Sequence, residues 1–314
     1  MVVIPGMVMV EIFLNIIAPI LLLLLLGLFL QRKFKFDLKS FSQLMTYGLM
    51  PAAIFMNIYR TDFNLQLLLE VALYLLLFTV AMMMIGIGLS RVLKLERNDA
   101  AIMKNGISLM NSGNYGLPVS QMLFSANPVG TSIQIIVLLF QNIMTYTYGL
   151  YNLIAATKSG WGIVKTFLKL PLIYAAILGA ILNGFDVNPP SFLLTPIQYL
   201  ADGFMAIALI ILGAQLAFIK IKAVNLAVVF TCLTRLIISP AVAIGIIFLL
   251  GIEGVIAQSL LVASALPTSR NSATLALEYD VNPDIAAQTV LITTLLSGIS
   301  VSVVVYLSSI LFPY

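Results

Sequence analysis

Apolar blocks of about 20 residues follow one another along nearly the whole chain, and this feature limits the fold more than any other. Only 9% of the 314 residues are charged and 61% are hydrophobic, whereas soluble domains carry about 25% charged residues. Each block is long enough to cross a bilayer as a helix. We therefore expect an all-α integral membrane protein with ten transmembrane helices. The ten blocks cover residues 12–30, 40–59, 65–93, 98–125, 129–156, 163–184, 193–217, 224–250, 254–279 and 284–311.

The composition excludes several kinds of chemistry. The chain has no histidine, which rules out a His-dependent triad, a His-ligated metal site and a His proton relay. Its one cysteine, Cys232, cannot form an intrachain disulfide or a Cys-rich zinc site. No G-x-x-x-x-G-K-[ST] loop is present, so ATP hydrolysis by this chain is not expected. The formal charge of +4 comes from residues spread between apolar blocks, which predicts no nucleic-acid partner.

The positions of the basic residues predict the orientation in the membrane. Thirteen of the 16 lysines and arginines follow or closely flank the first, third, fifth and seventh blocks, whereas the opposite connections hold only Arg60. The thirteen are Arg32, Lys33, Lys35, Lys39, Arg91, Lys94, Arg97, Lys104, Lys158, Lys165, Lys169, Lys220 and Lys222. Because basic loops stay in the cytoplasm, we expect both termini outside it and a location in the cell membrane. Basic residues follow the first block instead of preceding it, so we interpret that block as a retained helix.

Two blocks contain interruptions that a regular helix cannot accommodate. The segment 111–118, Asn-Ser-Gly-Asn-Tyr-Gly-Leu-Pro, lies inside block 98–125, and the segment 265–272, Ala-Leu-Pro-Thr-Ser-Arg-Asn-Ser, lies inside block 254–279. Proline removes an amide donor and clashes with the preceding turn, and glycine permits unusual backbone angles. Irregular backbone at membrane depth must be buried in protein or line a wet cavity. The alternative is that each proline merely kinks its helix.

The interruptions lie about half the chain apart, which indicates an internal repeat. An Asn-Pro pair, suited to a helix start, precedes both the fifth and the tenth block, at Asn127 and Asn282. We expect one five-helix repeat over residues 1–157 and a second over 158–314. Because five is odd, the second repeat would enter the membrane inverted. Broken helices at matching positions of inverted halves are typical of secondary transporters with a site near the midplane.

The chain resembles the auxin efflux carrier family, which includes plant PIN carriers and bacterial malate or malonate permease-like proteins. The resemblance covers essentially the whole chain and depends on segment 111–118, which matches the pattern Asn-x-Gly-x-x-Gly-Leu-Pro. Weaker support comes from Ala265-Leu-Pro, from Pro171 with Gly179, from Leu212-Gly-Ala and from Arg235 with Pro240. The long cytoplasmic loop of the large plant PIN carriers is absent here, so regulation through it is not expected.

The resemblance implies a fold similar to that of sodium/bile acid symporters. In that fold, helices 4 and 9 cross at their breaks. Helices 1, 2, 6 and 7 would form a scaffold, through which the protein could dimerise. Helices 3–5 and 8–10 would form a transport domain that moves like an elevator.

A broken helix offers unpaired amides and a partial positive charge, which suit an anion inside the bilayer. The substrate-binding candidates lie at or after the two breaks: Asn111, Ser112, Asn114, Pro118, Gln121, Pro267, Thr268, Ser269, Arg270 and Asn271. Arg270 is the strongest candidate, because a charged residue near mid-membrane is usually functional and a guanidinium can bind a carboxylate through two hydrogen bonds. The alternatives are that Arg270 snorkels to the surface or pairs with Glu278, and that the asparagines only satisfy backbone groups.

These observations predict a secondary transporter of a small organic anion, either a dicarboxylate such as malate or malonate, or an auxin-like carboxylate. We expect no cofactor and leave sodium or proton coupling open, because sodium would need oxygen ligands that the sequence does not single out. Two alternatives are an anion receptor without transport and an intramembrane enzyme, although no nucleophile with a base is evident. Arg235 is expected to snorkel or to pair with a buried acid. Tyr146, Tyr148 and Tyr151 are expected to lie in an interfacial aromatic belt, with the alternative that one of these tyrosines reaches the cavity.

Overall fold

The computed structural model describes residues 13–61, 65–154, 171–217 and 225–313, and every regular element in these ranges is helical. The first group of elements is η1 (Phe13–Ile17), α2 (Ala18–Phe34), α3 (Leu38–Leu44), η2 (Met45–Leu49), α4 (Met50–Arg60), α5 (Leu65–Val92), α6 (Arg97–Ser108), η3 (Ser112–Gly116), α7 (Leu117–Leu123), α8 (Pro128–Met144), η4 (Thr145–Gly149) and α9 (Leu150–Ile154). The second group is α11 (Pro171–Gly184), α12 (Ser191–Leu216), α13 (Leu226–Leu233), η5 (Thr234–Ile238), α14 (Ser239–Leu250), α15 (Gly254–Ser264), α16 (Arg270–Glu278) and α17 (Pro283–Leu311).

The chain is a multi-pass membrane protein. Within the described ranges, five continuous apolar helical segments are long enough to cross a bilayer. They are Leu67–Val92, Pro128–Leu153, Ser191–Leu216, Leu226–Leu250 and Pro283–Leu311. The first two predicted blocks form the shorter segments η1–α2 and α3–η2–α4, and block 163–184 is described only as α11.

Blocks 98–125 and 254–279 are each divided into two helices. The first helix of each pair ends at Ser108 or Ser264, and the next begins at Ser112 or Arg270. In the second break, Pro267 cannot donate a helical hydrogen bond and disfavours a helical conformation of the residue before it. Ser269 then caps α16, because its Oγ accepts a hydrogen bond from the Asn271 amide at 3.3 Å.

The two breaks pair with each other. Met110 and Thr268 form an antiparallel bridge. The Asn111 amide donates to the Pro267 carbonyl at 2.8 Å, and the Ser269 amide donates to the Leu109 carbonyl at 2.8 Å. These bonds satisfy main-chain groups that would otherwise be unpaired inside the membrane. The structure therefore places both breaks at one crossing point.

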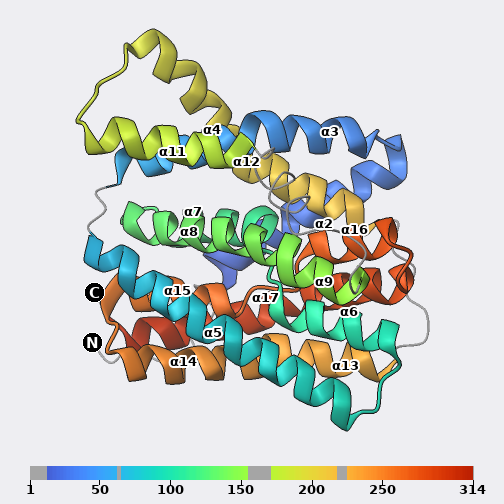
Figure 1. Cartoon of the computed structure of the whole chain (residues 1–314). Coiled ribbons are helices and arrows are strands. Elements are labelled where there is room, and N and C mark those ends of the chain that lie inside the picture. The colour runs from blue at the N-terminus through green and yellow to red at the C-terminus, as the bar shows by residue number, and fades with distance from the viewer. Residues whose placement is uncertain (1–12, 62–64, 155–170, 218–224, 314) are drawn as a thin grey trace.

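The helices form two groups, which Figure 1 shows one above the other. The upper group, here called the outer bundle, consists of α2, α3, η2, α4, α11 and α12. Helices α2 and α12 of this bundle pack very closely. A Cβ on Gly27 of α2 would lie 2.0 Å from the Ile210 carbonyl oxygen, and a Cβ on Gly213 of α12 would lie 1.9 Å from the Leu24 carbonyl oxygen. Such reciprocal glycine contacts are typical of tightly packed membrane helices.

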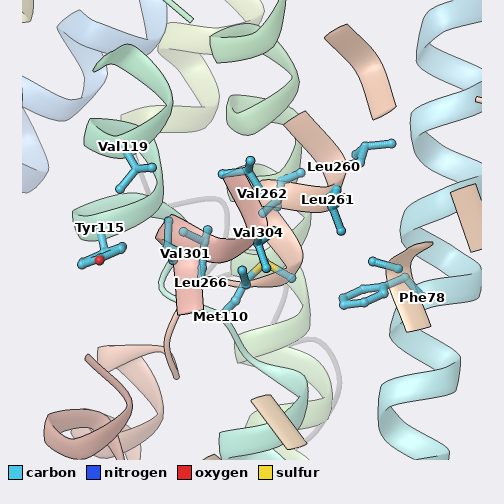
Figure 2. Close-up of a cluster of buried hydrophobic side chains, with 14 of the residues drawn as sticks. Phe78, Met110, Tyr115, Val119, Leu260, Leu261, Val262, Leu266, Val301 and Val304 are labelled. Atoms are coloured by element: carbon cyan, nitrogen blue, oxygen red, sulfur yellow. The ribbon is translucent and has the colours of Figure 1, made fainter. Parts of the chain in front are cut away.

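The second group, here called the crossing bundle, consists of α5–α9 and α13–α17 with η3, η4 and η5. A large apolar cluster surrounds the crossing on this side. Figure 2 shows that Met110 and Leu266, one from each break, lie beside Val301 and Val304 of α17 in this cluster. The two bundles touch where α12 packs on η3 and α7 and where α4 packs on α8.

Candidate functional site

A cavity of about 230 Å³ lies where the crossing bundle faces the outer bundle. Both breaks contribute to its wall, as do α8, η4 and α16 of the crossing bundle and η2, α4 and α11 of the outer bundle. The lining residues are Met45, Thr46, Met50, Met110, Asn111, Ser112, Gly113, Asn114, Leu138, Gln141, Asn142, Thr145, Tyr146, Leu172, Ser269, Arg270, Asn271 and Thr274. The wall is polar on the crossing side and largely apolar on the outer side.

Two buried amide groups in this wall lack a hydrogen-bond partner within the part of the chain that the structure describes. They are Asn111 Nδ2 and Gln141 Nε2, and their residues are only 5% and 3% exposed. Another polar group of each residue bonds within the protein. Gln141 Oε1 accepts from the Met110 amide at 3.2 Å, and the Asn111 carbonyl accepts from Gly116 at 2.9 Å. Since buried donors are normally paired, these two point to a ligand.

Arg270 brings a positive charge to the same wall. It is the first residue of α16 and is half-buried. Within the described ranges, its guanidinium forms no ion pair with a carboxylate, Glu278 included. A guanidinium shielded from water and without an acidic partner can hold a carboxylate through two hydrogen bonds.

The start of α16 and the start of the η3–α7 segment both open into the cavity. Ser269, Arg270 and Asn271 line it from α16, and Ser112, Gly113 and Asn114 line it from η3. The first amides of a helix have no partner inside the helix, and the aligned peptide dipoles place about half a positive charge there. The cavity therefore combines a guanidinium, two amide donors and two helix starts, all suited to negative charge.

Six of the ten residues predicted from the sequence line this cavity: Asn111, Ser112, Asn114, Ser269, Arg270 and Asn271. The other four lie elsewhere. Thr268 is fully buried in the crossing, where its Oγ1 donates to the Gly106 carbonyl at 2.8 Å and its amide donates to Thr293 Oγ1 at 3.2 Å. Pro267 also lies in the crossing.

Pro118 is buried in the first turn of α7. Gln121 lines a separate pocket beside Asn57 of α4 and Asp202 of α12.

The cavity also contains residues that were not predicted, namely Gln141, Asn142 and Thr145 with Tyr146. A signal for them exists in the sequence, because Gln134, Gln141 and Thr145 recur at helical spacing along one face of an otherwise apolar block. Gln134 supports the break from the same face by donating to the Ser112 carbonyl at 3.0 Å. Tyr146 lines the cavity, which matches the alternative left open for its tyrosine cluster and not the interfacial belt.

The site offers binding groups without evident reactive ones. Within the described residues, no three His, Cys, Asp or Glu side chains gather to hold a metal ion. Among the described residues, those that line the cavity include no carboxylate, cysteine or lysine side chain. The guanidinium and amide groups of this arrangement can bind and orient an anion.

Comparison with known proteins agrees with this interpretation. A family model described as "Membrane transport protein" (Mem_trans) matches residues 12–167 and again residues 158–305, which indicates an internal repeat.

Three relatives are similar over different shares of the chain. An uncharacterized transporter of Methanocaldococcus jannaschii is 27% identical over 267 residues, which are 82% of this chain and 86% of the relative. An uncharacterized transporter of Methanothermobacter thermautotrophicus is 27% identical over 62% of this chain and 63% of its own length. A Rhizobium meliloti protein named "Putative malonate transporter" is 28% identical over 46% of each chain.

Proposed function

This chain belongs to the Membrane transport protein family, also known as the auxin efflux carrier family, and from that premise we propose that it carries a small organic anion through the cavity at the helix crossing. The observation that carries the proposal is that three donors line one cavity. Asn111 Nδ2 and Gln141 Nε2 have no hydrogen-bond partner among the described residues, and the Arg270 guanidinium forms no ion pair with any of them. The family is one of transporters and not of enzymes, so the intramembrane enzyme is set aside.

The charge in the wall favours a dicarboxylate. Two helix starts contribute roughly half a positive charge each, and Arg270 contributes one more, so the wall matches an anion of about two negative charges. The cavity of about 230 Å³ is smaller than the roughly 300 Å³ at which drug-sized pockets begin. Malonate or malate suits this volume better than an auxin-like carboxylate does, and the name of the Rhizobium meliloti relative supports malonate.

We propose an elevator-type alternating access in which the outer bundle is the scaffold and the crossing bundle moves with the anion. The cavity lies between the two bundles, so a movement of one past the other would expose it to either side of the membrane. A reversible cross-link between the outer bundle and the crossing bundle, placed outside the cavity, should block uptake, and its cleavage should restore uptake.

We also propose that ten membrane-crossing helices form two inverted repeats, over residues 1–157 and 158–314. Helix pairing supports this, because α2 packs on α12 while their counterparts α11 and α4 pack on each other, and α5 packs on its counterpart α14. The distribution of basic loops supports termini outside the cytoplasm. A phosphatase that is active only in the periplasm should therefore be active when fused after the last residue. A fluorescent protein that fluoresces only in the cytoplasm should be dark at the same position.

Counterflow in proteoliposomes tests the function. Vesicles preloaded with unlabelled malonate should accumulate labelled malonate above empty-liposome levels, and a panel of mono- and dicarboxylates should compete according to charge and size. Sodium and proton gradients are imposed separately to identify any coupling. Saturable malonate binding without counterflow under every gradient would favour the receptor alternative and end the transporter proposal.

A further inference from the structure

Arg235 is the largest fully buried side chain of the described residues, and its surroundings are unusual for a charge. It lies in η5 at 0% exposure. Its Nη1 donates to the Ile107 carbonyl at 2.8 Å, and its Nη2 donates to the Ser264 carbonyl at 2.5 Å and to Ser239 Oγ at 2.7 Å. The expectation that Arg235 snorkels or pairs with a buried acid is wrong, because its partners are main-chain carbonyls and a hydroxyl.

The two carbonyls belong to the ends of the broken helices. Ile107 is in the last turn of α6, and Ser264 is the last residue of α15. The last carbonyls of a helix have no partner inside the helix and carry about half a negative charge. Two such ends present about one negative charge, which one guanidinium balances. The ring of Phe78 of α5 lies over the guanidinium, with its centroid 5.9 Å from the guanidinium carbon.

The oxygen atoms around Arg235 are the kind that bind a small cation. Two main-chain carbonyls and the Ser239 hydroxyl are hard oxygen ligands, the type preferred by sodium-like ions. The two carbonyls lie at the C-terminal ends of α6 and α15, the first helices of the two broken pairs, whereas Ser239 is the first residue of α14. A cation bound here would balance the partial negative charge of the two helix ends. The guanidinium of Arg235 already supplies this positive charge.

We propose that Arg235 is a resident cation that fills a monovalent-cation site in the crossing, so that anion transport needs no bound metal ion there. Arg235 is thus a positioning residue, since it stabilises the crossing that holds the anion donors and does not touch the anion. The transport part of this proposal rests on the proposed function. Removing the side chain should leave an empty, negatively polarised oxygen site that external guanidinium or sodium can occupy.

The test compares four forms of the full chain in detergent: wild type, Arg235→Lys, Arg235→Met and Arg235→Ala. Unfolding is followed with a thiol-reactive dye, because Cys232 is the sole cysteine and is buried. We expect Tm to fall by less than about 4 °C for the lysine variant and by about 8 °C or more for the methionine and alanine variants. Arg270→Ala serves as the matched control, because it removes an arginine from the opposite side of the crossing.

Each variant is then heated in the presence of about 20 mM guanidinium, sodium or N-methylglucamine. This guanidinium concentration is about a hundredfold below the molar concentrations that unfold domains. In Arg235→Ala, guanidinium or sodium should reverse at least about half of the decrease in Tm relative to wild type, and N-methylglucamine should reverse none of it. Arg235→Met should not recover, because its side chain fills the space. Arg270→Ala should show no cation-specific recovery of Tm.

Several results would overturn the proposal. These are a methionine variant as stable as wild type, equal losses for lysine and methionine, or an alanine variant that no small cation stabilises. If Arg235→Ala yields no folded protein, the lysine and methionine variants decide the question by the same criteria.

Counterflow separates this inference from the proposed function. Wild-type uptake should be equal in sodium and in N-methylglucamine, and uptake by Arg235→Ala should rise at least about fivefold when guanidinium or sodium is added. Wild-type counterflow that requires sodium would end the resident-cation proposal and leave the transporter standing. Wild-type protein that moves no anion would end the proposed function, whereas the Tm series would still test the cation site.

Discussion

The two membrane-embedded arginines of this chain lie at opposite ends of the same crossing and have opposite surroundings. Arg235 is fully buried, and main-chain carbonyls at two helix ends accept its hydrogen bonds. Arg270 is half-buried at a helix start, lines a cavity and, within the described residues, forms no ion pair. The positive charge of Arg235 complements the partial negative charge at helix C-terminal ends, whereas the positive charge of Arg270 adds to the partial positive charge at a helix start.

The comparison shows that burial of a charge does not by itself identify a ligand site. Both Nη groups of Arg235 donate inside the protein, and only its Nε has no partner among the described residues, so this arginine stabilises the fold. An arginine that lines a cavity beside amide donors favours an external anion instead. The unmet amides of Asn111 and Gln141 lie on the Arg270 side of the crossing, in the same cavity wall. Four predictions test this division of roles.

The largest effect is expected for Arg270→Ala. Loss of the guanidinium should lower malonate counterflow by about 100-fold, because truncating one partner of a shielded charge pair costs about 2–5 kcal/mol. Tm should change by less than about 3 °C, because Arg270 forms no ion pair with any residue that the structure describes. Arg91→Ala, which removes an exposed arginine of α5, is the control and should keep wild-type counterflow. Equal uptake in the two variants would remove Arg270 from the site.

The second effect is expected for Gln141→Glu, which keeps the acceptor for the Met110 amide but replaces the unpaired Nε2 donor by a charged oxygen. Counterflow should fall by about 10- to 100-fold, because a donor is lost and negative charge is placed beside the anion. Asn111→Asp should behave alike.

Gln134→Glu is the control for this pair, since its Nε2 donates to the Ser112 carbonyl and not to the cavity. It should lower Tm by several degrees, whereas Gln141→Glu should lower Tm little. A variant of Gln141 or Asn111 that transports normally would show that its amide does not hold the anion.

The third effect is expected at the crossing itself. Thr268→Val keeps the shape of the side chain but removes the hydrogen bond from Oγ1 to the Gly106 carbonyl. Leaving a buried carbonyl unpaired costs about 1–3 kcal/mol, so Tm should fall by about 2–8 °C while counterflow falls only about threefold. Thr268→Ser, which retains the hydroxyl, should stay within about 2 °C of wild type. A loss of uptake much larger than the loss of stability would place Thr268 in the anion site.

The smallest effect is expected for Ser269→Ala, which removes the cap on the start of α16. Loss of a serine cap costs about 1 kcal/mol, so Tm should fall by about 2–4 °C and half-saturation for malonate should rise about twofold. Ser269→Asp separates the two roles of this residue, because aspartate also caps a helix but adds negative charge to the cavity. It should keep Tm and abolish counterflow. Normal uptake by Ser269→Asp would contradict an anion site at this helix start.

Much of the candidate site could be predicted from residue types near the breaks. Asn111, Ser112, Asn114, Ser269, Arg270 and Asn271 were expected at the site and all line the cavity. Thr268 and Pro267 were expected there for the same reason but lie within the crossing, because the strand-like pairing of the two breaks turns their polar groups toward each other. Gln141 was missed because the direction of a polar side chain on a long helix depends on what packs beside it.

Sequence alone determined that this chain is a helical membrane protein with two interrupted helices, because hydropathy over 20 residues and the backbone limits of proline and glycine are local properties. Only the tertiary structure decided that the two interruptions bond to each other, that Arg235 joins the ends of α6 and α15, and that Gln141 reaches the same cavity as Arg270. These outcomes depend on contacts between residues far apart in the chain. Inside a membrane, every main-chain group must find such a partner, and the partner is chosen by packing in three dimensions.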